Sequence, residues 1–168
     1  MKEQEKLIRY RLSISRTFPA THPKAGQETN FVGKIQANDL SYIGEFEPKI
    51  HTIRGNYQLW EKRFEKIEKG EAVLELYYWT GKPYNSTCKT FATLKKEDGI
   101  GLQYLKFDEY DWSYATVDVG LVDTKTIFPS YVKFAKNDGL SVDDFKTWFK
   151  KTNLSEPFAI IHFTKFRY

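Results

Sequence analysis

Cysteine and histidine are scarce in this chain of 168 residues, which has one cysteine, Cys88, and three histidines. The histidines, at positions 22, 51 and 162, are far apart in the sequence. A disulfide framework needs pairs of cysteines, and a zinc site needs about four Cys or His ligands at characteristic spacings. The composition therefore predicts a chain without disulfides, bound metal or other cofactor, in a reducing compartment.

Long apolar runs are missing as well. No segment approaches the roughly 20 apolar residues that a membrane-spanning helix needs. The first six residues are mostly charged and lead directly into a strand-like segment, without the apolar stretch and small-residue cleavage site of a signal peptide. We therefore expect a cytoplasmic protein that does not enter the membrane.

Aromatic residues, by contrast, are abundant. They make up 17% of the chain, with 13 Phe, 11 Tyr and 4 Trp, which exceeds what aliphatic core packing needs. The net charge is +4, and its excess lies in the first 90 residues, which hold 15 Lys or Arg against 11 Asp or Glu. This balance mildly favours an anionic partner. The length predicts one domain over residues 1–168, because a chain of this size can bury a sufficient core.

The hydrophobic pattern predicts more strands than helices. Alternating apolar residues and clusters of strand-forming residues predict strands at 7–15, 73–79, 87–94, 101–107, 114–119 and 158–166. Helical spacing of apolar residues predicts helices at 31–37, from 57 to a cap at Gly70, and after Ser141. Because the central strands follow one another without crossover helices, an α+β sheet or small barrel is favoured over a doubly wound fold.

Residues 49–54 (KIHTIR) hold the most informative polar cluster, in which Lys49, Thr52 and Arg54 lie on a short strand-like segment before Gly55. Along a straight strand Lys49 points to one side, and Thr52 and Arg54 point to the other. A bend or bulge in the segment would let the three side chains converge on one site. From the residues alone, the alternative is a surface strand whose charges are solvated.

The pattern Lys-x-x-Thr-Ile-Arg followed by a turn resembles the signature of ASCH proteins, a branch of the PUA-like barrels, and in particular that of bacterial N4-acetylcytidine amidohydrolases. Residues 137–146 (NDGLSVDDFK) and 157–163 (PFAIIHF) are similar to the closing helix and last strand of that family. The resemblance implies a PUA-like small barrel or mixed sheet with flanking helices. It also implies that Lys49 and Thr52 are the catalytic pair, and that Asp138 is the acidic catalytic residue before the closing helix.

The chain departs from those enzymes at Asp138, where they have the longer glutamate. A carboxylate displaced by about one bond length can lose much of its catalytic effect. The chain also has additional segments at 17–31 and 80–86, and in these it resembles an uncharacterised group of bacterial and phage proteins. The matching motifs cover a minority of the chain, so they support the fold more than the activity.

An amidohydrolase would use these side chains in defined roles. Thr52 would be the nucleophile toward an amide carbonyl, and Lys49, with its pKa lowered by desolvation, would be the base that activates it. Asp138 would orient Lys49 or pass a proton to the leaving amine. Arg54 would stabilise developing negative charge or hold a phosphate.

A second candidate ligand-binding element is the turn at 80–86, which Trp79, Lys82 and Tyr84 flank or occupy. An aromatic ring beside a cation on a loop is a common way to stack and neutralise single-stranded nucleic acid. The alternative interpretation is an aromatic hairpin plug over the core. No phosphate-binding loop is predicted at Gly81, because the preceding glycine at Walker spacing and the following Ser or Thr are missing.

The histidines have less specific surroundings. His22 and the nearby Lys24 lie in a proline-rich loop, where we expect solvated side chains because most loop charges are solvated. His162 alternates into a strand of Ile and Phe, which predicts a core histidine with a hydrogen-bond partner. His51 either supports the ligand-binding residues around it or is exposed.

The sequence leaves three functional hypotheses. The first is a domain that binds RNA or a modified nucleobase, with Lys49 and Arg54 at the mouth of a cleft. The second is an amidohydrolase acting on an acylated nucleoside such as N4-acetylcytidine, and the third is a phage or host interaction protein whose cleft is relict. Aspartate at position 138 argues against a simple transfer of activity, whereas the presence of both Lys49 and Thr52 argues against a relict cleft. We therefore place binding first and hydrolysis second.

Overall fold

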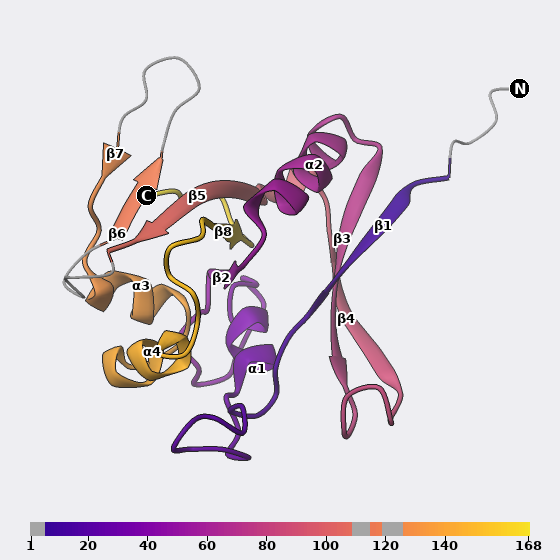
Figure 1. Cartoon of the computed structure of the whole chain (residues 1–168). Helices are drawn as coiled ribbons and strands as arrows, with labels where there is room; N and C mark the ends of the chain where they lie inside the picture. Colours follow the sequence, from indigo (N-terminus) through magenta and orange to yellow (C-terminus); the bar gives the residue numbers. More distant parts are fainter. Residues whose placement is uncertain (1–5, 109–114, 119–125) are drawn as a thin grey trace, which may run out of the picture.

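The computed structural model describes residues 6–108, 115–118 and 126–168, which form an α+β fold (Figure 1). The strands are β1 (Ile8–Ser13), β2 (His51–Arg54), β3 (Ala72–Trp79), β4 (Cys88–Leu94), β5 (Gly101–Phe107), β6 (Ala115–Asp118), β7 (Thr126–Ile127) and β8 (Phe158–His162). The helices are α1 (Phe31–Gln36), α2 (Tyr57–Glu68), the short η1 (Lys96–Asp98), α3 (Tyr131–Asn137) and α4 (Val142–Phe149). Within these ranges no helix is long and apolar enough to cross a membrane.

The strands form two sheets, with the orders β1-β3-β4 and β2-β8-β5-β6-β7. The first sheet is mixed, because β1 runs parallel to β3 while β4 runs antiparallel to it. The second is antiparallel throughout. The α+β class predicted from the sequence is therefore confirmed. In the described part of the chain the two sheets do not join into a closed barrel.

Strand β8 lies between two hydrophobic cores, because alternate side chains of a strand point to opposite faces. Ala159 and Ile161 belong to the core shared with β1, β3, α1 and α2, whereas Phe158 and Ile160 belong to the core shared with β5, β6, α3 and α4. Strand β2 pairs with β8, with Thr52 opposite Ile161. The polar segment 49–54 is thereby placed between the two cores.

Helix α2 forms as its sequence pattern predicts. Trp60, Phe64 and Ile67 recur at helical spacing and are buried on one face. The Asn56 side chain accepts a hydrogen bond from the backbone N–H of Leu59, which satisfies one of the free donors at the start of the helix. The helix holds the start of β3 beside β1, and so fixes the three-stranded sheet.

The junction between α3 and α4 positions the polar cluster. Ser130 and Ser141 cap the two helices through their side chains. Between the helices Gly139 has a φ of +78°, which favours glycine, and a Cβ at this position would meet the Lys49 Cβ at 3.2 Å. The junction therefore packs tightly against Lys49, and Asp138, the C-cap of α3, lies directly beside it.

Candidate functional site

Lys49 lies just outside strand β2, where the chain is held by two other contacts. Its backbone N–H donates to the carbonyl of Lys34 at 2.9 Å, and the N–H of Ile50 donates to the carbonyl of Asn137 at 2.9 Å. Only His51 to Arg54 pair with β8. The side chain of Lys49 therefore does not have to follow the alternation of side chains between the two faces of β2. Lys49, Thr52 and Arg54 all line one cavity, so the three side chains converge.

Lys49 and Asp138 form a buried ion pair. The Lys49 Nζ donates to the Asp138 Oδ1 at 2.5 Å and to the Asp138 backbone carbonyl at 2.6 Å. The two residues are 1% and 5% exposed. The ammonium also lies 4.2 Å from the centroid of the Phe31 ring, which adds a cation–π contact. Removing either charge would leave the other without its partner in a largely dry environment.

Burial shifts the acid–base equilibria of this pair. Burial lowers the pKa of Lys49 to about 8, with Asp138 offsetting part of the shift and Arg54 adding to it. Burial by itself raises the pKa of Asp138, but Lys49 and His51 outweigh it and hold the pKa of this carboxyl below its ordinary value. Asp138 is thus ionised at neutral pH. A lysine with a pKa near 8 has an appreciable neutral fraction there, as a general base requires.

The Arg54 side chain forms a hydrogen bond with Thr52 instead of projecting into solvent. Its Nη1 donates to the Thr52 Oγ1 at 2.9 Å, and its Nη2 donates to the backbone carbonyl of Ser13 at 2.7 Å. Because Thr52 Oγ1 accepts this bond, its own hydrogen remains available to a base. In the described part of the chain both hydrogen bonds of the Lys49 Nζ go to Asp138, so Lys49 must turn before it can take that hydrogen.

His51 and Tyr168 extend the network behind Asp138. The Asn137 amide donates to the Tyr168 hydroxyl at 2.9 Å, and the hydroxyl lies 2.7 Å from the His51 Nε2. Since the hydroxyl already accepts from Asn137, its own hydrogen is free to go to Nε2. The other ring nitrogen, Nδ1, lies 3.7 Å from the Asp138 Oδ1, which is beyond hydrogen-bond distance. Burial lowers the pKa of His51, so the ring is neutral at pH 7. Sequence patterning gave no signal for Tyr168 or Asn137.

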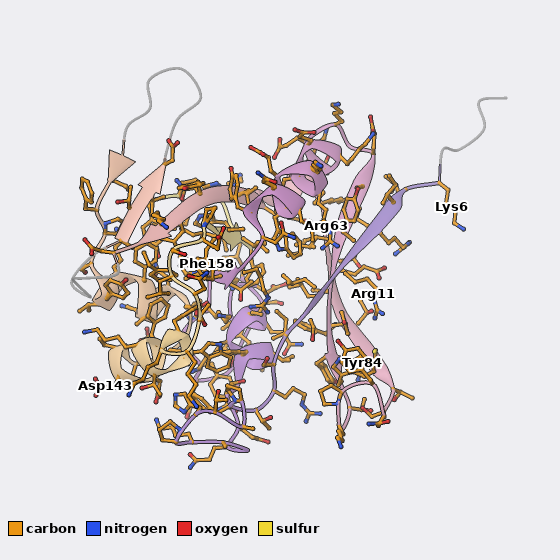
Figure 2. The ribbon with its side chains drawn as sticks, in the orientation of Figure 1. Lys6, Arg11, Arg63, Tyr84, Asp143 and Phe158 are labelled. Atoms are coloured by element: carbon orange, nitrogen blue, oxygen red, sulfur yellow. The ribbon has the colours of Figure 1, made fainter. Side chains whose placement is uncertain are left out.

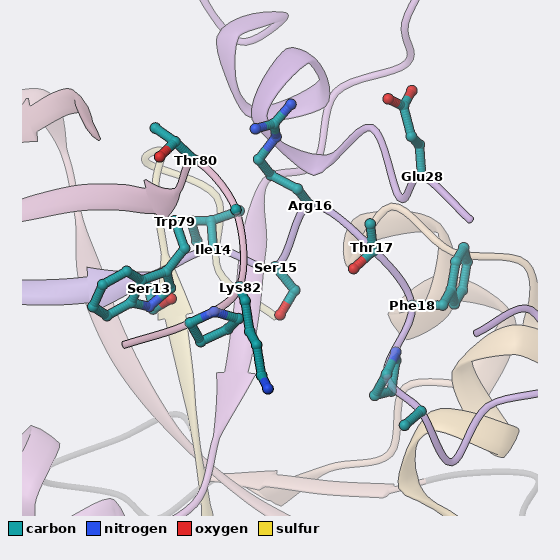
Figure 3. A pocket seen from close by; sticks show the side chains of 14 residues that line it. Ser13, Ile14, Ser15, Arg16, Thr17, Phe18, Glu28, Trp79, Thr80 and Lys82 are labelled. Atoms are coloured by element: carbon teal, nitrogen blue, oxygen red, sulfur yellow. The ribbon is translucent and has the colours of Figure 1, made fainter. Parts of the chain in front are cut away.

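The polar cluster surrounds a small cavity that lies next to a much larger groove. The cavity has a volume of about 20 Å³, and Lys49, Thr52, Arg54 and Asp138 all line it. The groove has a volume of about 740 Å³ and lies between residues 13–20 and 79–83 (Figure 3). Ile14 and Ser15 line both spaces. The cavity has room for one water at most, so these two residues separate the polar cluster from any larger ligand in the groove.

The walls of the groove combine an aromatic ring with charged side chains. Trp79 is the last residue of β3 and Lys82 lies in the turn after it, whereas Arg16 and Glu28 come from the segment between β1 and α1 (Figure 3). The Ser15 carbonyl accepts a hydrogen bond from the Thr29 hydroxyl at 2.7 Å, which fixes the floor. The groove therefore presents the indole ring of Trp79, two cations and one carboxylate.

The remaining candidate residues lie in different surroundings, some exposed and some in the core. Tyr84 is 88% exposed and contacts Trp79, with ring centroids 5.1 Å apart, so it does not plug the core. His51 is fully buried and lines neither the cavity nor the groove. His162 is a core histidine as predicted, with its Nε2 2.9 Å from the Gln103 Oε1.

The expectation that His22 is solvated is wrong. His22 is 5% exposed, and its ring packs between Phe18, at 4.6 Å, and Trp148, at 6.3 Å. Lys24 forms an ion pair with Asp144 at 2.7 Å. The physical reason is that the additional segment at 17–31 folds against α4 and buries the ring there. This packing supports the wall of the groove that carries Arg16.

Metal ligands do not gather at this site. Over the described ranges, no three His, Cys, Asp or Glu side chains come together as a metal ion would require. Asp138 and His51, the two candidate ligands nearest the cavity, are already engaged with Lys49 and Tyr168.

Comparisons of the chain with protein-family models, with curated proteins and with solved structures gave no match.

Proposed function

We propose that this chain binds an RNA segment or a modified nucleobase in the groove between residues 13–20 and 79–83. The observation that carries the proposal is that this groove meets the cavity of Lys49, Thr52 and Asp138 at Ile14 and Ser15. The groove volume of about 740 Å³ is in the range of small-molecule sites. An aromatic ring on one wall and cations on both walls suit the stacking of a base and the neutralisation of phosphate.

The proposal includes membership of the ASCH branch of the PUA-like superfamily. Support comes from the contact between Lys49 and Asp138, which are 89 positions apart in the sequence. It comes also from the place of Asp138, one short turn before the helix α4. The sheet β1-β3-β4 is mixed, which is compatible with the small barrel or mixed sheet that the resemblance implies.

Binding to short single-stranded RNA is expected to be salt-dependent and to require Arg16 and Lys82. Each phosphate contact that is lost should reduce the slope of log affinity against log salt by about 0.7, so Arg16→Ala with Lys82→Ala should reduce it by about 1.4. Fluorescence anisotropy of a labelled RNA trinucleotide, titrated from about 20 to about 200 mM salt, measures this slope.

A matched control uses two exposed lysines on α2 and just after it, Lys62 and Lys69. Lys62→Ala with Lys69→Ala removes the same charge away from the groove and should leave the slope unchanged. If the control lowers affinity as much as the groove variant does, the binding reflects net charge alone. If the RNA does not bind at low salt, the proposed function is wrong.

Hydrolysis of an acylated nucleoside is the second candidate function. The observation that favours it is the position of Thr52 in the same cavity as Lys49, whose pKa is lowered to about 8. The Thr52 hydroxyl is a poor nucleophile unless a neutral base takes its proton. For an amide in the groove to reach Thr52, the Ile14 and Ser15 segment has to move aside.

A further inference from the structure

The sheet β1-β3-β4 has one face in the core and one face that points away from the rest of the molecule (Figure 1). Leu12, Leu74 and Leu76 occupy the inner face and are buried. Arg11 belongs to the outer face, and its label in Figure 2 lies on the side of the sheet opposite the other elements. A mixed sheet with one solvated face normally carries isolated polar residues there, so a row of aromatic rings on this face is unusual.

Four residues form a continuous row on the outer face, which we name the basic–aromatic row: Arg11, Tyr77, Trp79 and Tyr84. The Arg11 guanidinium lies 4.0 Å from the centroid of the Tyr77 ring. The rings of Tyr77 and Trp79 meet edge to face, with centroids 6.1 Å apart and an angle of 71°. Trp79 continues to Tyr84 at 5.1 Å. Arg11 covers one face of the Tyr77 ring, whereas Tyr84 is 88% exposed and keeps a ring face available for stacking.

Positive charge accompanies the row. Arg9 and Arg11 both approach Glu75, at 2.5 and 3.8 Å, so one carboxylate is shared by two guanidinium groups. Their side chains are 62% and 45% exposed, whereas that of Glu75 is 14% exposed. With Lys82 at the other end of the row, the surface presents cations beside aromatic rings. This is the chemistry that tracks the backbone and bases of a single strand.

We infer that the ligand of this chain is a single-stranded nucleic acid, which leaves the groove at Trp79 and continues over the basic–aromatic row. Trp79 lines the groove and is also a member of the row, so the two surfaces are continuous. A base stacks on the exposed ring of Tyr84, while phosphates lie near Arg9, Arg11 and Lys82. The inference rests on the proposed function and extends it, because a free nucleoside would need the groove alone.

The test compares a fluorescein-labelled RNA dinucleotide with an octanucleotide of the same base. The longer RNA should bind the wild-type chain about a hundredfold more tightly, well above the several-fold gain from extra binding registers. Tyr84→Ser should reduce this gain at least about fivefold, since one stacked base contributes about that much or more. Arg11→Gln should also reduce it, because it removes a cation near the phosphates. Both variants should bind the dinucleotide as the wild type does. Because Tyr84 is 88% exposed, its replacement leaves the core intact.

Two control variants match these changes in chemistry. Arg63 is also stacked on aromatic rings, 4.6 Å from Trp60 and 5.4 Å from Tyr10, but it lies on α2 on the inner side of the sheet (Figure 2). Arg63→Gln should keep the full length dependence. Phe128, which follows β7 and is 61% exposed, provides the control for Tyr84. Phe128→Ser should also keep the full gain in affinity from dinucleotide to octanucleotide.

The outcomes separate this inference from the proposed function. If the dinucleotide binds through Arg16 and Lys82 but the octanucleotide gains only a few-fold, the strand does not cross the row and the inference is overturned while the groove proposal stands. If neither RNA binds, the proposed function fails and takes the inference with it. If sedimentation shows a dimer that Tyr84→Ser dissociates, the row is a contact between two copies, and the inference is overturned in favour of self-association.

Discussion

Replacement of Asp138 by asparagine is expected to destabilise the fold by about 3–5 kcal/mol near neutral pH, because it leaves the Lys49 ammonium buried without a counter-ion. The Lys49 Nζ donates to the Asp138 Oδ1 at 2.5 Å, and its other hydrogen bond goes to a neutral carbonyl. Lys49 is 1% exposed and the cavity beside it has room for one water at most, which cannot replace the charge of the lost carboxylate. Urea unfolding followed by tryptophan fluorescence measures the change in the free energy of unfolding.

The loss of stability caused by Asp138→Asn should become smaller as pH rises. Without Asp138, the folded-state pKa of Lys49 falls below its wild-type value of about 8, whereas in the unfolded chain it stays near 10.5. Between the folded and unfolded values the unfolded chain holds more protons, so stability rises with pH. The variant begins to gain this stability at a lower pH than the wild type does. The deficit should therefore shrink as pH rises from about 6 to about 8.

The acid side provides a second check on the same pair. The pKa of Asp138 in the folded chain lies below its ordinary value of 3.8. A carboxyl with a lowered pKa contributes stability above its unfolded pKa, and this contribution is lost as pH falls through the folded value. Asp138→Asn lacks the contribution at every pH. Wild type and variant should therefore converge in strong acid.

Asp143→Asn is the matched control, because it makes the same chemical change at an exposed residue in the first turn of α4 (Figure 2). It should cost about 0.3–1 kcal/mol through the helix dipole. The double variant Lys49→Met with Asp138→Leu should recover most of the stability, since apolar side chains can replace a buried pair with little loss. A deficit for Asp138→Asn no larger than that for Asp143→Asn would show that the pair contributes nothing to the fold.

Local patterning predicts most of the elements but misses α3. Tyr131, Phe134 and Ala135 are buried at helical spacing, and Ser130 caps the helix through its side chain. The helix has only seven residues, and tyrosine, valine and phenylalanine in its sequence are also strand formers. In so short a segment the hydrophobic period does not separate the two structures. The cap residue before the apolar positions is the signal that identifies it.

The polar cluster shows a different limit of sequence reasoning. The chemistry of Lys49 and Thr52 follows from their residue types, but nothing local marks Asp138, which was found through the family resemblance. The contact of His51 with Tyr168 has no sequence signal at all, because it depends on how the chain after β8 returns past β2. The small size of the cavity likewise depends on Ile14 and Ser15, which directly follow β1. Long-range packing, rather than local sequence pattern, therefore determines whether a ligand can reach Lys49, Thr52 and Asp138.

Turnover of N4-acetylcytidine is expected to be slow or absent, because the cavity beside Thr52 has a volume of only about 20 Å³. Any turnover should fall about a thousandfold or more in Thr52→Ala, which removes the nucleophile, and to a similar level in Lys49→Ala, which removes its base. Asp138→Glu introduces the acid found in the amidohydrolases that the chain resembles, and it should preserve or raise the rate. Liquid chromatography of the released cytidine measures the turnover rate of the wild type and of the three variants.

The pH dependence of that turnover distinguishes a lysine base from a structural lysine. Lys49 can accept the Thr52 proton only when it is neutral, and its pKa is about 8. The neutral fraction rises about tenfold per pH unit below that value and levels off above it, so kcat/KM should rise with pH and reach a plateau above about pH 8. A rate that is flat from about pH 6 to about 9, or that survives both Thr52→Ala and Lys49→Ala, excludes this catalytic pair. Absence of turnover at every pH would eliminate hydrolysis and leave the groove as a binding site.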